Sequence, residues 1–270
     1  MTPSRRASGR PRLGQHFLRS EATAGRILDA LGVLPGQTVV EIGPGKGALT
    51  GRLLDRGIHV VAFELDPFLA SRLERGYDGR PLWVSSVDAL KADFGEAIAK
   101  AGAAPPVPLV GNLPYESATP MLRAFVRRPD LFSRIVAMIQ KEVADRLVAS
   151  PRGDAYGYLT VDLGAHGRCR RLFDVGPREF EPPPRVQSTV VEILPRPADA
   201  DCAALLAVAS AGFQTRRKTL VNSLTALWGR ERAIEAVAAA GLLPTARAEE
   251  LGLETFRRLA ELLGEKRQPV

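Results

Sequence analysis

Short apolar runs alternate with longer amphipathic stretches along the first half of the chain. Between Gln37 and about Ala137 the runs are rich in Val, Ile and Leu. Buried strands of a parallel sheet read as near-continuous apolar runs, and the stretches between them fit crossover helices. We therefore predict helices in the intervals and strands at residues 38–42, 59–64, 82–85, 108–112 and 134–139.

The pattern changes in the second half of the chain. Residues 159–163 and 188–194 have the character of strands without a full helix between them, which predicts an antiparallel hairpin that closes the sheet. Pro195 and Pro197 follow, and from residue 201 to 263 Ala, Leu, Glu and Arg recur at helical spacing. We predict an α/β, Rossmann-like domain over residues 1–197 and a small all-helical domain over residues 198–270.

Composition excludes several classes of protein. The chain of 270 residues is 45% hydrophobic and 25% charged, and it has no apolar run near the roughly 20 residues that span a bilayer. The basic first twelve residues lack the apolar segment of a secretory signal, so we expect a cytoplasmic protein without a membrane partner. Cys169 and Cys202 are far apart and lack metal-ligand spacing, so we expect neither a disulfide framework nor a bound metal.

The formal net charge is +7, and its distribution is uneven. Residues 1–26 hold six arginines against the single acid Glu21, and Arg168, Arg170 and Arg171 form a second cluster. Such patches favour a polyanionic partner, because neutralised phosphates release counterions. A solvated surface is the alternative interpretation of either patch.

A glycine turn follows the first predicted strand. Gly43, Gly45 and Gly47 alternate after residues 38–42, and glycine lets a ligand approach the backbone closely. The spacing departs from the dinucleotide-binding fingerprint, which requires a glycine where this chain has none. The turn indicates a nucleotide-like cofactor without identifying it.

Acidic residues follow the next two predicted strands. Glu64, followed by Leu65, lies 23 residues after Glu41, where an acid can accept both ribose hydroxyls. Asp88 follows the third strand, where it can accept a hydrogen bond from an adenine amine. Either acid could instead cap a helix, and we prefer that interpretation for Asp66 before Pro67. These positions suit an adenosine, carried by S-adenosylmethionine or by a nicotinamide dinucleotide.

The fourth strand ends in Asn112, Leu113, Pro114 and Tyr115. The exocyclic amine of adenine is a poor nucleophile, and the Asn112 side-chain oxygen and the Leu113 carbonyl could accept its hydrogens. Both acceptors would stabilise the positive charge that develops on the nitrogen during methyl transfer. Pro114 fixes the local backbone, and Tyr115 would stack on the base. Amine methyltransferases that act on DNA adenine or on glutamine use a related tetrapeptide, and a capped Pro-Tyr turn is the structural alternative.

These motifs occur in an order that resembles one family over nearly the whole chain, the KsgA-type rRNA adenine dimethyltransferases. That family modifies two adjacent adenines near the 3′ end of small-subunit rRNA. The matching segments are residues 14–18, the Gly43 turn, Glu64, Asp88, and residues 112–115, 140–143, 155–157, 180–188 and 213–224.

The resemblance implies roles for individual residues. It implies that S-adenosylmethionine is the cofactor, and that Asn112 binds the methyl-acceptor amine in the catalytic group Asn112, Leu113, Pro114, Tyr115 and Phe180. Phe180 would wall the target-base pocket opposite Tyr115, although it could instead belong to the core. The implied cofactor-binding residues are Gln15, His16, Leu18, Gly43, Gly45, Glu64, Leu65, Asp88, Ala89 and Asn112.

The resemblance also implies a partner. Arg216, Arg217 and Lys218 resemble the family's RNA-contacting helix, although a basic triplet can be a solvated face. The expected partner is small-subunit rRNA in a pre-ribosomal particle, bound by a monomer. Two alternatives remain: a large-subunit rRNA methyltransferase of the erythromycin-resistance type, and a non-catalytic RNA- or DNA-binding factor. His16 stands where the family often has Asn, and Glu116 and Ser117 replace a common Asn-Ile pair.

Overall fold

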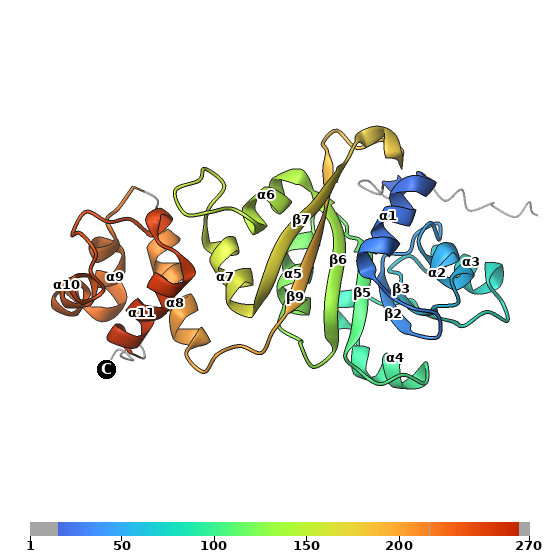
Figure 1. Ribbon diagram of the computed structural model, residues 1–270, viewed down its shortest axis with the longest axis horizontal. Coiled ribbons are helices and arrows are strands. Elements are labelled where there is room, and N and C mark those ends of the chain that lie inside the picture. Colours follow the sequence, from blue (N-terminus) through green and yellow to red (C-terminus); the bar gives the residue numbers. More distant parts are fainter. Residues whose placement is uncertain (1–15, 216, 265–270) are drawn as a thin grey trace, which may run out of the picture.

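The computed structural model describes residues 16–215 and 217–264, and it is elongated (Figure 1). A sheet flanked by helices forms one part, and a cluster of helices from the C-terminal part of the chain forms the other. The sheet has seven strands in the order β4-β3-β2-β5-β6-β9-β7. Strands β2 to β6 run parallel, and β9 is antiparallel to both β6 and β7. Their bounds are β2 Thr38–Ile42, β3 His59–Phe63, β4 Leu82–Ser85, β5 Val107–Asn112, β6 Phe132–Gln140, β7 Gly167–Val175 and β9 Ser188–Pro195.

A separate two-stranded pair joins distant parts of the chain. β1 (Phe17–Leu18) pairs with β8 (Phe180–Glu181) in antiparallel register. The short 3-10 helix η2 (Pro177–Glu179) precedes β8, and the backbone N–H of Arg19 donates to the Glu179 carbonyl at 2.9 Å. This pair brings the N-terminal segment against the proline-rich segment that follows β8.

Helices cover the two faces of the sheet unequally. One apolar cluster joins α1 and α2 to the first face, and another joins α4, α5, α6 and part of α7 to the second. Side-chain oxygens of Ser20, Asp66 and Asp93 accept backbone N–H bonds at the starts of α1, α3 and α4, where such N–H groups lack helical partners. The bounds are α1 Glu21–Leu31, α2 Thr50–Asp55, α3 Pro67–Gly76, η1 Ala89–Lys91, α4 Phe94–Lys100, α5 Ala118–Val126, α6 Lys141–Leu147 and α7 Tyr158–His166.

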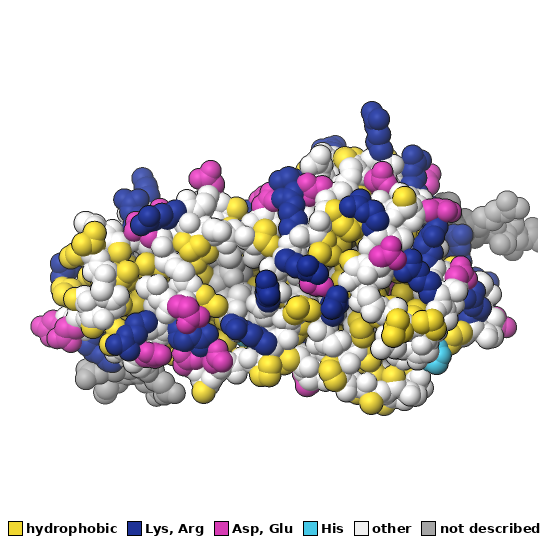
Figure 2. All heavy atoms as spheres, viewed as in Figure 1, with side chains coloured by type: hydrophobic (Ala, Val, Ile, Leu, Met, Phe, Trp, Pro, Cys, Tyr) yellow, Lys and Arg dark blue, Asp and Glu magenta, His cyan; other side chains and the backbone are white. Residues whose placement is uncertain are grey.

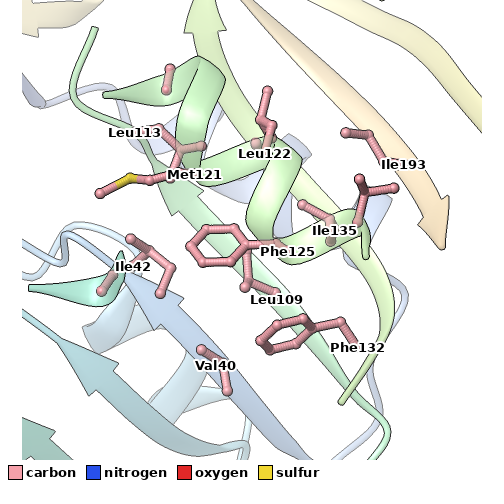
Figure 3. Close-up of a cluster of buried hydrophobic side chains, with 14 of the residues drawn as sticks. Val40, Ile42, Leu109, Leu113, Met121, Leu122, Phe125, Phe132, Ile135 and Ile193 are labelled. Carbon is pink, nitrogen blue, oxygen red and sulfur yellow. The ribbon is translucent and has the colours of Figure 1, made fainter. Parts of the chain in front are cut away.

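The core on the second face lies directly below the residues that end β5. Figure 3 shows Leu113 and Met121 at one end of this cluster, with Phe125 of α5 packed over Leu109 and near Phe132. The Phe125 and Phe132 rings meet edge to face, with centroids 5.8 Å apart. This packing fixes α5 against β5 and holds the turn between them in place.

The C-terminal helices form their own apolar cluster and share it with α7. Val161 and Ala165 of α7, together with Tyr156, are buried against these helices. The Tyr156 hydroxyl donates to the Leu251 carbonyl at 2.5 Å, which ties the two parts of the chain together. The bounds are α8 Cys202–Phe213, α9 Leu220–Trp228, α10 Arg230–Ala239, η3 Ala248–Glu250 and α11 Leu253–Leu263.

The structure confirms the five predicted parallel strands and the strand at 188–194, but residues 159–163 are helical, so that prediction was wrong. They belong to α7, which packs on the sheet core through Leu163 and on the C-terminal helices through Val161. A helix buried on both sides has no polar stripe, so its sequence lacks the helical period. β9 instead pairs with β7, which is an edge strand. The arginines of β7 interrupt the alternation of apolar and polar residues by which a strand is predicted from sequence.

Candidate active site

The predicted residues at the strand ends converge at one edge of the sheet. β2, β3, β4 and β5 are parallel, so their carboxyl ends meet at the same edge, where open α/β sheets bind ligands. Gly43, Glu64, Asp88 and Asn112 follow or end these four strands. Two cavities that share Gly43, Glu64, Pro114 and Tyr115 open at this edge.

The two cavities differ in size and lining. The larger, of about 610 Å³, lies between the ends of β3 and β4 and the start of α5; the smaller, of about 80 Å³, lies against β1. The larger is lined by Ile42, Gly43, Phe63, Glu64, Leu65, Asp66, Val87, Asp88, Ala89, Leu90, Pro114, Tyr115, Glu116, Ser117, Met121 and Gln140. The smaller is lined by His16, Phe17, Gly43, Gly45, Glu64, Asn112, Leu113, Pro114 and Tyr115.

The turn after β2 needs glycine at two positions. Gly43 and Gly45 have φ angles of 64° and 59°, in the left-handed region that side chains disfavour. A Cβ atom at Gly45 would lie 2.8 Å from Cδ1 of Phe17, closer than real Cβ contacts. The turn therefore lies directly under β1, where Gly43 lines both cavities and Gly45 lines the smaller one.

Glu64 is held by two backbone donors. Gly45 N–H donates to its Oε2 at 2.9 Å, and Asp66 N–H donates to its Oε1 at 3.0 Å. Burial raises the pKa of this carboxyl, because the charged form loses water. A carboxylate has about four lone-pair sites, so two acceptor sites remain for hydroxyl groups of a ligand.

Both neighbouring acids cap helices. The Asp66 carboxylate accepts from Phe68 N–H at 2.9 Å, which confirms it as the N-cap of α3. The Asp88 carboxylate accepts from Leu90 N–H at 3.0 Å at the start of η1 and also lines the larger cavity. Capping uses one Asp88 oxygen, so the capping interpretation and the adenine-binding interpretation are compatible at this residue.

The amide of Asn112 has a defined orientation. Its Nδ2 donates to the His16 carbonyl at 2.9 Å, so Oδ1 lies on the other side of the amide. Leu113 is 1% exposed because its side chain enters the core, while its backbone remains in the cavity wall. The result is an acceptor oxygen beside a rigid Leu-Pro backbone, as the sequence predicts.

Tyr115 is fixed from two sides. Its hydroxyl lies 2.8 Å from Oγ of Ser188 at the start of β9, and its ring centroid lies 5.6 Å from that of His16. Nδ1 of His16 lies 2.8 Å from the Pro182 carbonyl, so this nitrogen carries the proton and donates. Burial raises the pKa of Tyr115, which keeps the phenol neutral.

The remaining predicted residues are less central. Leu18 is buried beside the glycine turn and lines a third cavity, and Leu65 and Ala89 line the larger cavity. Phe180 is 2% exposed and belongs to the apolar cluster under α1, while neither cavity described above includes it. Arg217 and Lys218 lie between α8 and α9. Gln15 and Arg216 lie outside the described residues.

Phe17, Gln140 and Ser188 are among the residues at the site that the predicted set lacks. Phe17 contacts the glycine turn, Gln140 ends β6 at the larger cavity, and Ser188 bonds to Tyr115. All three occur in the segments that carry the family resemblance, which is the signal that could have identified them.

The sequence profile of the family described as ribosomal RNA adenine dimethylase matches residues 6–265. The chain belongs to this family. It is 43% identical over 261 residues to the ribosomal RNA small subunit methyltransferase A of Paramagnetospirillum magneticum, covering 94% of this chain and 90% of that protein. The protein of the same name from Bordetella bronchiseptica is 43% identical over 258 residues, covering 94% of each chain.

Solved structures agree in fold. A dimethyladenosine transferase from Plasmodium falciparum superimposes with a TM-score of 0.75 at 22% identity, covering 90% of this chain and 96% of that one. The 23S rRNA methyltransferase ErmE gives a TM-score of 0.69 at 27% identity, covering 92% and 99%. As a member of the ribosomal RNA adenine dimethylase family, the protein is an enzyme that methylates rRNA adenine with S-adenosylmethionine as cofactor.

The donor set fits this cofactor. Glu64 offers acceptor sites for ribose hydroxyls, Asp88 faces the same cavity, and the turn at Gly43 leaves backbone open to a ligand. S-adenosylmethionine, when bound, supplies a methyl group activated by a sulfonium. Within residues 16–215 and 217–264 the structure has no cluster of three or more acids, histidines or cysteines that could hold a metal ion. No helix in that part of the chain is long and apolar enough to span a bilayer.

Beneath the glycine turn lies a second buried acid, Glu41, which is 1% exposed. Its Oε2 accepts from the Thr50 hydroxyl at 2.7 Å, and burial raises its pKa to about 7. The folded state therefore binds a proton between about pH 4.5 and 7 that the unfolded chain has released, so this stabilising protonation is lost as pH rises through 7.

We expect Glu41→Gln to remove this loss. The free energy of unfolding of the variant minus that of wild type should increase by up to about 3 kcal/mol between pH 4.5 and 8. This follows from about 1.4 kcal/mol for each unit by which the pKa is raised. Denaturant unfolding at each pH measures the difference. The exposed glutamate Glu235 gives the matched control Glu235→Gln, which should follow wild type. A pH-independent difference for Glu41→Gln would show that Glu41 does not titrate in this range.

Proposed function

We propose that the enzyme dimethylates the exocyclic amines of two adjacent adenines near the 3′ end of small-subunit rRNA. The relatives named small subunit methyltransferase A, similar over nearly their full length, support the small-subunit substrate. We infer that it works as a monomer in the cytoplasm, on a pre-ribosomal particle. Residues 1–197 would carry catalysis, and residues 198–270 would form a helical RNA-binding domain.

The observation that carries the mechanism is the orientation of Asn112. Because Nδ2 is engaged by the His16 carbonyl, Oδ1 and the Leu113 carbonyl are available to accept the two hydrogens of the adenine amine. These acceptors favour the positive charge that develops on the nitrogen, and their fixed positions avoid reorganisation. Tyr115, held by Ser188, would stack on the base.

The cofactor residues divide between the two cavities. Glu64, Leu65, Asp88 and Ala89 would hold the adenosine part in the larger cavity. His16, Gly43 and Gly45 would contact the rest of the molecule beside Asn112, with Leu18 and Gln15 supporting that end. The amine and the methyl group would thus meet where the cavities join.

Labelling of isolated ribosomal subunits tests this substrate. Small and large subunits from a strain lacking the protein are incubated with the enzyme and radiolabelled S-adenosylmethionine. A parallel reaction with the Asn112→Ala variant is the control, and it should transfer little label to either subunit. We expect label in small subunits alone, and mass analysis should find two dimethylated adenines. Label confined to large subunits would instead establish the erythromycin-resistance type of activity, which the structural similarity to ErmE makes the relevant alternative.

A further inference from the structure

One face of the sheet is covered by α1 at the active-site end of its last three strands and is open at their other end. α5, α6 and α7 pack on the opposite face of β6, β9 and β7. On this face α1 packs on β6, and it shares an apolar cluster with Val190 of β9 and Val175 of β7. In Figure 1 the ribbons of β6, β9 and β7 are seen unobstructed from this side. We call this surface the open face; its polar and half-buried residues are Arg134, Arg168, Arg170, Phe173, Glu192 and Leu194.

The arginine cluster of β7 divides between the two faces. Arg168 pairs in register with Leu194 and Arg170 with Glu192, so both point to the open face. Arg171 has the opposite direction and forms ion pairs with Asp145 of α6 and with Asp174. Two of the three arginines therefore contribute to the open face, and the third stabilises the packing of α6.

Three of the arginines at the open face, Arg26, Arg134 and Arg170, are positioned by contacts with other side chains. Glu192 is 2% exposed and pairs with both Arg134 and Arg170, so one carboxylate neutralises only one of two cations. The guanidinium of Arg26, from α1, lies 3.7 Å from the centroid of the Phe173 ring. Guanidinium groups held in this way present a fixed, planar set of donors that matches phosphate oxygens.

The charge of this surface is positive along its length. Arg134 and Arg170 pair with one buried acid, Glu192, and a second acid, Glu179, lies near Arg26, so the four arginines of this surface outnumber the acids around them. Figure 2 views this side and shows Lys and Arg side chains over β7 and β9 with few acidic ones. Charged residues on an edge strand commonly prevent strand pairing, but Arg26 and Arg134 are not on the edge strand. The edge role therefore does not account for the whole surface.

The open face leads away from the active site. Val175, at one end of β7, pairs with Ser188, whose hydroxyl contacts Tyr115. Arg168 lies seven residues away along the strand, about 23 Å at roughly 3.3 Å per residue. Near the site end, Arg19 donates through Nε to the Arg178 carbonyl, which adds two exposed arginines beside the start of α1.

We propose that the open face binds phosphates of the rRNA substrate at a distance from the nucleotide whose base enters the site. The inference rests on rRNA as the substrate, and it assigns a contact surface in addition to Arg217 and Lys218, which lie between α8 and α9. A fixed row of arginines with little exposed apolar surface suits a phosphodiester backbone, because such contacts position the nucleic acid without reading its sequence.

The test uses the double variant Arg26→Gln/Arg168→Gln, which leaves the buried Glu192 pairs intact. Its matched control is Arg72→Gln/Arg75→Gln on α3, which makes the same change of charge. α3 lies beside β4, the edge strand opposite β7. Affinity for a protein-free small-subunit rRNA fragment is measured at several salt concentrations. Each lost phosphate contact should flatten the slope of log affinity against log salt by roughly 0.7–0.9.

Raising the salt from 50 to 200 mM lowers the affinity of each protein by some factor. If both contacts are removed, that factor should be roughly ninefold smaller for the variant than for wild type. The control should parallel wild type, and thermal unfolding should confirm that all three proteins are folded. Methylation of a short hairpin that contains only the target adenines should be unchanged, while kcat/KM on whole small subunits falls and kcat at saturation is retained.

Two results would overturn the proposal. One is a variant slope equal to that of wild type on protein-free rRNA. The other is a defect seen on intact subunits and absent on protein-free rRNA, which would identify a ribosomal protein as the partner. Failure of wild type to label small subunits would refute the proposed function, and the slope comparison would still decide whether the open face binds RNA.

Discussion

Replacing Asn112 with alanine is expected to lower turnover by roughly 10²–10³ at saturating cofactor and RNA, by analogy with removal of one preorganised hydrogen-bond partner. In the proposed mechanism the side-chain oxygen of Asn112 would accept a hydrogen from an amine whose charge rises during methyl transfer. Because Nδ2 is already bonded to the His16 carbonyl, the amide needs no rearrangement when the base arrives. Removing it eliminates a fixed acceptor at the reacting nitrogen.

Single-turnover assays on small-subunit rRNA measure this effect without contributions from product release. Asn222, the other asparagine of the chain, is exposed on α9 and gives the matched control Asn222→Ala, which should retain kcat. Cofactor binding and the thermal unfolding temperature of each variant are measured in parallel, so that loss of fold is separated from loss of chemistry. Turnover of Asn112→Ala within threefold of wild type would remove Asn112 from the catalytic group.

The part of the site at the strand ends could be predicted from the sequence. Parallel strands buried on both faces read as unbroken apolar runs, so each strand end is marked by the first polar or glycine residue after it. Gly43 and Glu64 are the first residues after β2 and β3, Asn112 ends β5, and Asp88 follows β4 by three residues. Parallel pairing brings all four to one edge. Local sequence and one topological rule were sufficient for this half of the site.

Contacts between distant segments could not be predicted from those patterns. The bond from Asn112 to His16 joins residues 96 apart, and the bond from Tyr115 to Ser188 joins residues 73 apart. Both depend on where the folded chain places β1 and β9. The spacing of apolar residues within one segment does not contain this information. The orientation of the Asn112 amide is therefore a property of tertiary structure.

Phe180 shows the same limit in another way. The resemblance implied a pocket wall, and a core position stayed equally open. In the structure β8 pairs with β1, and the Phe180 side chain is buried with Val175 and Val190 under α1. Its role toward the target base stays a prediction. The proline-rich segment after β8 is held beside the site by the hydrogen bond from His16 to the Pro182 carbonyl.

Removing the Glu64 carboxylate is expected to weaken cofactor binding by at least about 10²-fold. Its two oxygens accept from Gly45 and Asp66 and still offer acceptor sites to the ribose hydroxyls. A hydrogen bond to a charged group contributes about 1.5–3 kcal/mol, so loss of two costs at least about 3 kcal/mol. Calorimetric titration of Glu64→Ala with S-adenosylhomocysteine measures the change.

The matched control for this prediction is Glu116→Ala, because Glu116 is an exposed glutamate that lines the same cavity. Its dissociation constant should stay near that of wild type. Glu64→Gln separates the charge from the shape of the side chain, since the amide keeps one acceptor oxygen for the Gly45 or Asp66 N–H. Binding to Glu64→Gln should be weaker than to wild type and stronger than to Glu64→Ala.

The pH dependence gives an independent check on Glu64. Burial raises its pKa, so on acidification the wild-type carboxylate is protonated at a higher pH than an ordinary glutamate. Protonation converts an acceptor site into a donor, so wild-type affinity should fall on acidification from that higher pH, while the affinity of Glu64→Gln stays nearly constant. Parallel curves for the two proteins would mean that another group titrates and that Glu64 does not hold the ribose as a carboxylate.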